Sequence, residues 1–125
     1  MPEDPRRPLL WAARLAFAGA LFVTFWFAFA PPGHGAGFFP WDKANHILAF
    51  YVLTGLALAA FPRARLVWLA LGLSGVGALI EVIQGLPFVH RDCDVWDWVA
   101  DTCAILSVMA VVGGAALRRR LMPTA

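Results

Sequence analysis

Four long apolar stretches constrain the fold of this chain more than any other feature of its sequence. They cover about residues 9–30, 44–61, 66–85 and 94–117, and a helix that crosses a bilayer needs about 20 mostly apolar residues. The 125-residue chain is 61% hydrophobic and only 14% charged, so it has too few polar side chains to cover a water-soluble domain. We therefore predict an all-α fold, a single four-helix transmembrane bundle.

The first apolar stretch is compatible with two interpretations. Arg6 and Arg7 precede it, and an Ala-x-Ala sequence at residues 28–30 ends it, as in a cleaved signal peptide. However, the stretch is longer than the apolar region of an ordinary signal peptide, and Pro31 would follow the cut. These two features favour a retained transmembrane helix.

Basic residues are concentrated at one end of the predicted helices. Multi-pass proteins keep lysine and arginine on the cytoplasmic side, so we predict an N-in, C-in orientation in which cytoplasmic tails at residues 1–8 and 121–125 flank a transmembrane domain at residues 9–120. Only Lys43 and Arg91 fall at the opposite, outward end. The run at residues 118–120 follows an apolar helix, which is typical of a topology anchor and gives no indication of a nucleic-acid partner. The other eight of the ten basic residues are Arg6, Arg7, Arg14, Arg63, Arg65, Arg118, Arg119 and Arg120.

Acidic residues show the opposite distribution and form stripes on three of the helices. On the second helix Asp42 and His46 are four residues apart, and on the third Glu81 and Gln84 are three apart, so each pair shares a helical face. On the fourth helix Asp94, Asp97 and Asp101 fall at i, i+3 and i+7, an aspartate stripe that runs inward for about 10 Å at 1.5 Å per residue. Ser74 and Gly77 lie on the face of Glu81, where small residues allow a neighbouring helix to approach. Six acidic residues lie at the outward end: Asp42, Glu81, Asp92, Asp94, Asp97 and Asp101.

An ionised aspartate near the bilayer centre costs about 2.5–3.5 kcal/mol on insertion scales. The polar stripes of the three helices are therefore expected to face one another rather than lipid. Lys43 and Arg91 are the two fixed cations available to six acids, so some carboxylates must be solvated, protonated or bound to something outside the chain. The predicted polar site consists of Asp42, Lys43, His46, Glu81, Gln84, Arg91, Asp94, Asp97 and Asp101.

No metal or cofactor is predicted from the sequence. Cys93 and Cys103 form neither a CxxC pair nor a Cys/His pattern, and the chain has no HExxH motif and no second histidine within a span. His34 and His90 are expected to be solvated loop residues.

Three spaced motifs resemble the VanZ-like family of small bacterial membrane proteins. The motifs are "DKANH" at residues 42–46, "EVIQ" at residues 81–84 and "RDCDVWDWVADTCA" at residues 91–104. The chain departs from the family pattern at Asp101, where asparagine is frequent, and at Ala104, where glycine is typical. The resemblance covers residues 41 to about 112. It implies a multi-pass protein of the bacterial cytoplasmic (inner) membrane that acts in the cell envelope, in a family named after a factor that lowers teicoplanin sensitivity.

Three functions remain open at this point. In the first, an outward-facing polar site binds a membrane lipid head group, a lipid-linked cell-wall precursor or a lipoglycopeptide, with Lys43 and Arg91 at its rim. In the second, His46, Glu81 and the aspartates carry out intramembrane acid–base or metal-assisted catalysis on a lipid-linked envelope substrate. In the third, the buried carboxylates relay protons or serve transport, although four helices leave a monomer little room for an alternating-access cavity.

Overall fold

The computed structural model describes residues 4–31 and 39–122, and its described residues form helices and no strand. Each of the four helices is long and apolar enough to cross a membrane. The prediction of an all-α, four-helix transmembrane bundle is confirmed. The helices are α1 (Arg7–Phe29), α2 (Asp42–Ala60), α3 (Leu66–Gln84) and α4 (Val95–Leu121).

The helix ends differ from the predicted ones by a few residues, for local reasons. α1 begins at Arg7 and has Pro8 in its first turn, where a proline costs no helical hydrogen bond. α2 begins at Asp42, because a carboxylate is favourable at the positive end of the helix dipole. α4 continues to Leu121 and carries the three arginines of residues 118–120 in its last turn, where cations are favourable for the same reason.

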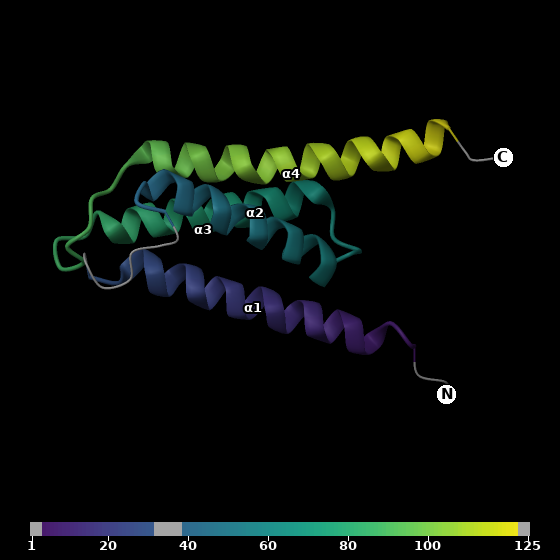
Figure 1. The fold of residues 1–125 in the computed structure, drawn as a ribbon, viewed down its shortest axis with the longest axis horizontal. Coiled ribbons are helices and arrows are strands. Elements are labelled where there is room, and N and C mark those ends of the chain that lie inside the picture. The colour runs from purple at the N-terminus through teal and green to yellow at the C-terminus, as the bar shows by residue number, and fades with distance from the viewer. Residues whose placement is uncertain (1–3, 32–38, 123–125) are drawn as a thin grey trace.

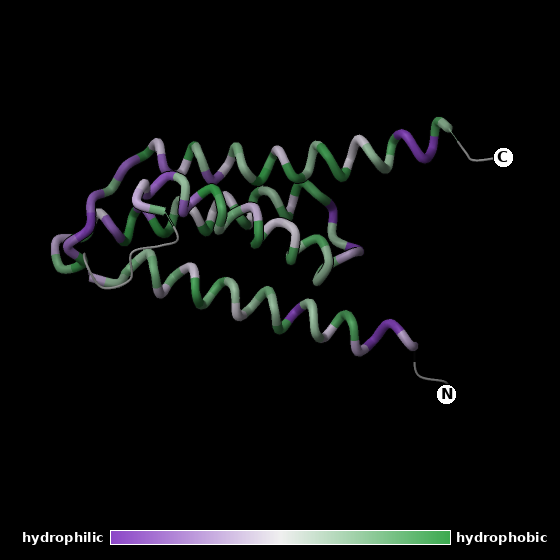
Figure 2. Tube along the Cα trace, in the orientation of Figure 1, coloured by the Kyte–Doolittle hydropathy of each residue, from purple (hydrophilic) through white to green (hydrophobic). Residues whose placement is uncertain are grey.

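The helices run alternately up and down, so that the end of α1, the start of α2 and the α3–α4 connection lie at one end, and the start of α1 and the end of α4 lie at the other (Figure 1). α2 contacts all three other helices, whereas α1 and α4 do not touch within the described part of the chain. Hydrophilic segments gather at the two ends and leave an apolar band between them (Figure 2). The side of the membrane on which each end lies stays a prediction. So does the solvated position of His34, because this residue lies outside the described residues.

The apolar core is built by α2, α3 and α4, with α1 packed on its edge. Phe50 and Leu53 of α2 and Ile105 of α4 are fully buried, and Ile80 of α3 is 1% exposed. α1 has no buried residue and contributes half-buried side chains such as Phe25. Since lipid tails are as apolar as these side chains, close van der Waals packing holds the helices together, and α1 has the least of it.

Arg14 joins α1 to the far end of α2. Its Nε–H donates to the carbonyl of Ala60 at 3.3 Å, one of the carbonyls that a helix end leaves without an internal partner. The guanidinium lies over the rings of Trp11 and Phe61, 5.4 and 5.8 Å from their centroids. This charge within an apolar stretch is thus satisfied by a helix C-terminus and two aromatic faces.

Candidate functional site

Lys43 joins the beginning of α2 to the beginning of α4. Its ammonium Nζ donates to Asp94 Oδ2 at 2.5 Å and to Asp97 Oδ1 at 2.6 Å. Asp94 is the N-cap of α4 and accepts the backbone N–H of Trp96 at 2.9 Å. The hydrogen bond from the Lys43 ammonium, together with the one from Trp96, lowers the pKa of the Asp94 carboxyl. One lysine therefore pairs with two carboxylates of the aspartate stripe.

His46 and Asp101 form a pair deeper between the same two helices. The imidazole Nδ1 lies 3.1 Å from Asp101 Oδ1, and the two side chains are 9% and 0% exposed. Because an ionised carboxylate can only accept hydrogen bonds, Nδ1 carries a proton, and when the imidazole is neutral Nε2 keeps a free lone pair. Nε2 lies 3.8 Å from Asp42 Oδ2, beyond hydrogen-bond distance.

Small and hydroxyl-bearing residues of α3 allow α4 to approach closely. A β-carbon added to Gly77 would come within 2.9 Å of Asp101 Oδ2 and 3.4 Å of Trp98 Cδ1. Ser74 Oγ lies 2.9 Å from the hydroxyl of Thr102, and the indole Nε1–H of Trp98 donates to the Ser74 carbonyl at 3.1 Å. The predicted close approach at this stripe of α3 is confirmed.

Glu81 of α3 holds the start of α4 through a hydrogen bond to its backbone. Its Oε2 accepts the backbone N–H of Asp94 at 2.9 Å, and the side chain is buried. Its other oxygen, Oε1, is buried with no hydrogen-bond partner among the described residues. Burying a charged group without a hydrogen-bond donor is costly, so the burial of this oxygen disfavours the ionised form of Glu81.

The α3–α4 connection delivers Arg91 to the same end of the bundle. His90 is exposed and has a φ of 54°, a left-handed conformation that is uncommon for residues other than glycine. The next residue, Arg91, places its Nη2 atom 3.8 Å from Asp42 Oδ1 with 22% of its side chain exposed. This distance exceeds that of a hydrogen bond, so the guanidinium lies near the Asp42 carboxylate without donating a hydrogen bond to it.

Gln84 is the one predicted site residue whose contact lies elsewhere. Its Nε2–H donates to the carbonyl of Ala28 on α1 at 2.9 Å, and it is 2% exposed. This is an interhelical hydrogen bond of the kind that polar side chains form within membranes. The other eight predicted residues form two contacting groups. Lys43, Asp94, Asp97 and Glu81 make up one, and Asp42, His46, Arg91 and Asp101 the other. The groups meet where ligand atoms of Asp42, His46 and Asp97 lie within 4.8 Å of one another, and we name the eight residues together the polar cluster.

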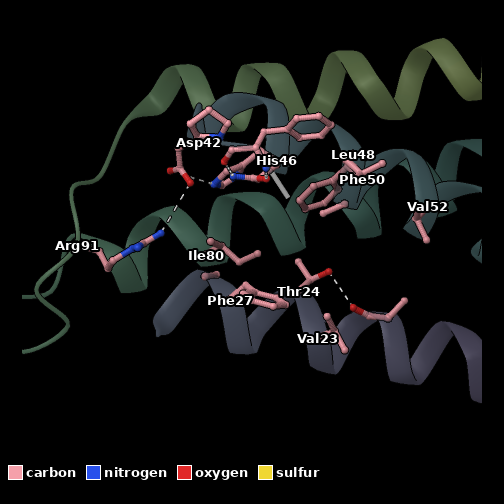
Figure 3. Close-up of a pocket in the computed structure, with 16 residues that line it drawn as sticks. Val23, Thr24, Phe27, Asp42, His46, Leu48, Phe50, Val52, Ile80 and Arg91 are labelled. Atoms are coloured by element: carbon pink, nitrogen blue, oxygen red, sulfur yellow. Dashed lines mark hydrogen bonds and ion pairs between the residues drawn. The ribbon is translucent and has the colours of Figure 1, made fainter. Parts of the chain in front are cut away.

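A cavity of about 360 Å³ lies between α1 and α2 and ends at the polar cluster. Figure 3 shows Asp42, His46 and Arg91 at one end of it, with Val23 and Val52 at the other. Most of the residues that line it are apolar, among them Phe27 of α1 and Ile80 of α3. Val23 and Val52 are about half exposed, so the cavity extends to the lipid-facing surface of the bundle.

Sequence reasoning missed two parts of this region. Asn45 holds the chain before α2 through two hydrogen bonds, from the Phe39 N–H and to the Phe39 carbonyl, both at 2.9 Å. The ability of asparagine to replace backbone partners in turns was the available signal. The α1 wall of the cavity, including Val23 and Phe27, left no signal, because apolar residues in a membrane helix are expected at every position.

One histidine and two carboxylates come close enough to share a metal ion. Asp42, His46 and Asp97 each offer one ligand atom, and these atoms lie within 4.8 Å of one another. The same histidine, held by Asp101, also has the arrangement of a general base with an orienting carboxylate. The site can therefore serve ligand binding, metal binding or proton transfer.

Comparisons with known proteins give no relative: no family model, curated protein or solved structure matches the chain.

Proposed function

We propose that this chain is a VanZ-like multi-pass protein of the bacterial cytoplasmic membrane that binds an amphiphile of the cell envelope, a lipid head group or a lipoglycopeptide, and thereby lowers sensitivity to teicoplanin. The observation that carries the proposal is the cavity between α1 and α2, which is apolar along its length and has Asp42, His46 and Arg91 at one end. An amphiphile likewise has an apolar part, its tail, and a polar part, its head group. The sequence motifs at residues 42–46, 81–84 and 91–104 support the family and the compartment.

The size of the cavity suits part of an amphiphile. Its volume of about 360 Å³ lies within the range of roughly 300–1,000 Å³ that is usual for small-molecule sites. Because half-exposed Val23 and Val52 border it, a tail that is longer than the cavity can continue into the surrounding acyl chains. The polar end then receives the head group.

Arg91 is the residue best placed to recognise an anionic head group. The two carboxylates on Lys43 already occupy that ammonium at 2.5 and 2.6 Å, whereas Arg91 is 3.8 Å from Asp42. A guanidinium presents several donors in one plane and binds phosphate or carboxylate in bidentate fashion. We therefore assign head-group binding to Arg91 and structural charge pairing to Lys43.

The test is a resistance assay in a teicoplanin-sensitive bacterium that expresses the protein. Wild type is expected to raise the tolerated teicoplanin concentration, and Arg91→Ala is expected to abolish this rise at an unchanged amount of protein in the membrane. Arg65→Ala, at the other end of the bundle, is the matched control and should behave as wild type. Full activity of Arg91→Ala, or a loss that only follows the amount of protein, would overturn the assignment.

A second assay measures binding directly. Ala49 lines the cavity, and Ala49→Trp is expected to fill it and reduce the lipid that copurifies in native mass spectrometry. Ala110 is exposed on α4, so Ala110→Trp is the control of equal bulk. Equal lipid content in all three proteins would contradict a ligand in this cavity.

The alternative is an intramembrane acid–base enzyme that acts on a lipid-linked substrate. The buried His46–Asp101 pair, with Nδ1 held at 3.1 Å and Nε2 near the cavity, favours it. The enzyme hypothesis predicts a product from a lipid phosphate or lipid-linked sugar incubated with purified protein, and its loss in His46→Gln while lipid still binds. A pure binding protein gives no product in either case.

A further inference from the structure

We propose that Asp42, His46 and Asp97 form a binding site for a divalent metal ion of the Zn²⁺ type, independently of what occupies the neighbouring cavity. One atom from each residue lies within 4.8 Å of the others. Zinc bonds of about 2.0–2.2 Å bring two ligand atoms to within about 4 Å of each other. Asp42 has a side chain that is 58% exposed, so it has room to adjust toward a bound ion.

The orientation of His46 is the strongest support for a metal. Metal-binding histidines usually donate their second ring N–H to a carboxylate, which fixes the tautomer and makes the free nitrogen more basic. Asp101 accepts from Nδ1 in this manner at 3.1 Å and is fully buried. Nε2 is therefore the free nitrogen, and it is the nitrogen that lies on the side of Asp42.

The charge of the polar cluster provides a second, independent argument. Five carboxylates, those of Asp42, Glu81, Asp94, Asp97 and Asp101, stand against the two fixed cations Lys43 and Arg91, which leaves three negative charges uncompensated when all five are ionised. Glu81 also has an oxygen that is buried without a partner in the described structure. Since ionised carboxylates are costly at membrane depth, a divalent ion stabilises this cluster by offsetting two of the three charges.

Lys43 does not block the site. It contacts one carboxylate oxygen of Asp97, Oδ1, at 2.6 Å, and a carboxylate has a second oxygen that can bind a metal. Three protein ligands leave one position of a four-coordinate zinc ion open. Asp42 and His46 also line the cavity, so water or an anionic group within the cavity can take this position.

The test uses the full-length protein in detergent, purified with a tag that contains no histidine and treated with a chelator. Zinc is then added, and bound metal per chain is measured by elemental analysis after desalting, with affinity from isothermal titration. We expect one Zn²⁺ per wild-type chain. Asp42→Asn and His46→Gln should each lower the affinity at least tenfold, and Asp101→Asn should lower it by about 10–100-fold through the imidazole.

Asp92 provides a matched control, because it is an exposed acid of the α3–α4 connection and lies outside the polar cluster. Asp92→Asn should bind zinc as wild type does. If His46→Gln fails to fold, Asp42→Asn decides the matter, since this side chain is largely exposed. The proposal is overturned if wild type binds no stoichiometric zinc, which would indicate that protons neutralise the cluster, or if Asp42→Asn and Asp92→Asn bind equally well.

Discussion

Gly77 of α3 faces the carboxylate of Asp101 on α4 so closely that a β-carbon at residue 77 would lie 2.9 Å from Asp101 Oδ2. Gly77→Ala should therefore destabilise the bundle by about 1–3 kcal/mol, the usual cost of overpacking. Gly75, two residues away on the same helix, has nothing within 4 Å of an added β-carbon. Gly75→Ala is the matched control and should be neutral or stabilising, because alanine is the better helix former. Thermal unfolding in detergent measures both, and equal stability of the two variants would refute the close contact.

The loss of stability on removal of Lys43 should be partly reversed when one of its carboxylate partners is also removed. Lys43→Met leaves Asp94 and the buried Asp97 without their cation, so it should lower the unfolding temperature. In the double variant Lys43→Met, Asp97→Asn the buried charge is gone, and the unfolding temperature should rise again. A double variant less stable than Lys43→Met alone would show that Asp97 is stabilised by groups other than Lys43.

The tautomer of His46 can be read directly. Because Asp101 accepts from Nδ1 at 3.1 Å, nitrogen-15 NMR of histidine-labelled, metal-free protein should show a protonated Nδ1 and an unprotonated Nε2 at alkaline pH, where the imidazole is neutral. Asp101→Asn keeps a carbonyl acceptor and should preserve this tautomer, whereas Asp101→Leu should produce a mixture. His46→Gln identifies the signal by its absence. A dominant Nε2–H tautomer in wild type would contradict the geometry described above.

Stability should fall at acidic pH through Asp94. Its pKa is lowered from 3.8 by the Lys43 hydrogen bond, so the unfolded state binds this proton more tightly than the folded state does. The resulting stabilisation is complete above the unfolded value and is lost as the pH falls through the lower, folded value. Asp94→Asn should therefore show a smaller drop in unfolding temperature between pH 5 and pH 3. Identical pH profiles for variant and wild type would exclude this contribution.

The two native cysteines can test the predicted orientation. Cys93 is exposed in the α3–α4 connection, and Cys103 lies within α4. In spheroplasts, a membrane-impermeant maleimide should label Cys93 in a Cys103→Ser background. A Thr124→Cys variant without native cysteines should be labelled only after permeabilisation. The reverse pattern would show that the polar cluster faces the cytoplasm.

Much of the site was predictable because ionised groups avoid hydrocarbon. That rule alone indicated that the stripes of Lys43, His46 and Asp97 would turn toward one another, and the contacts among them agree with it. The pairing itself was not predictable. Whether His46 meets Asp101 depends on how α2 and α4 are rotated and how deeply they interlock, and Gly77 of a third helix sets part of that packing.

The role of α1 could not be inferred from its sequence. Its length and hydropathy identified a membrane helix, and the helix is present. However, the contact that fixes it to α3 comes from Gln84, a polar residue that the sequence grouped with the charged site, and it uses a backbone carbonyl at Ala28. Backbone acceptors carry no sequence signature, so this assignment needed the structure.

The peripheral position of α1 has a consequence for how a ligand arrives. α1 touches α2 and α3 but not α4 in the described structure, and the cavity on its inner side is bordered by half-exposed Val23 and Val52. The proposed amphiphile can therefore enter sideways from the leaflet in which it resides and move its polar end toward Arg91. This route requires no passage through water, because the tail moves directly from the acyl chains of the bilayer into the apolar cavity.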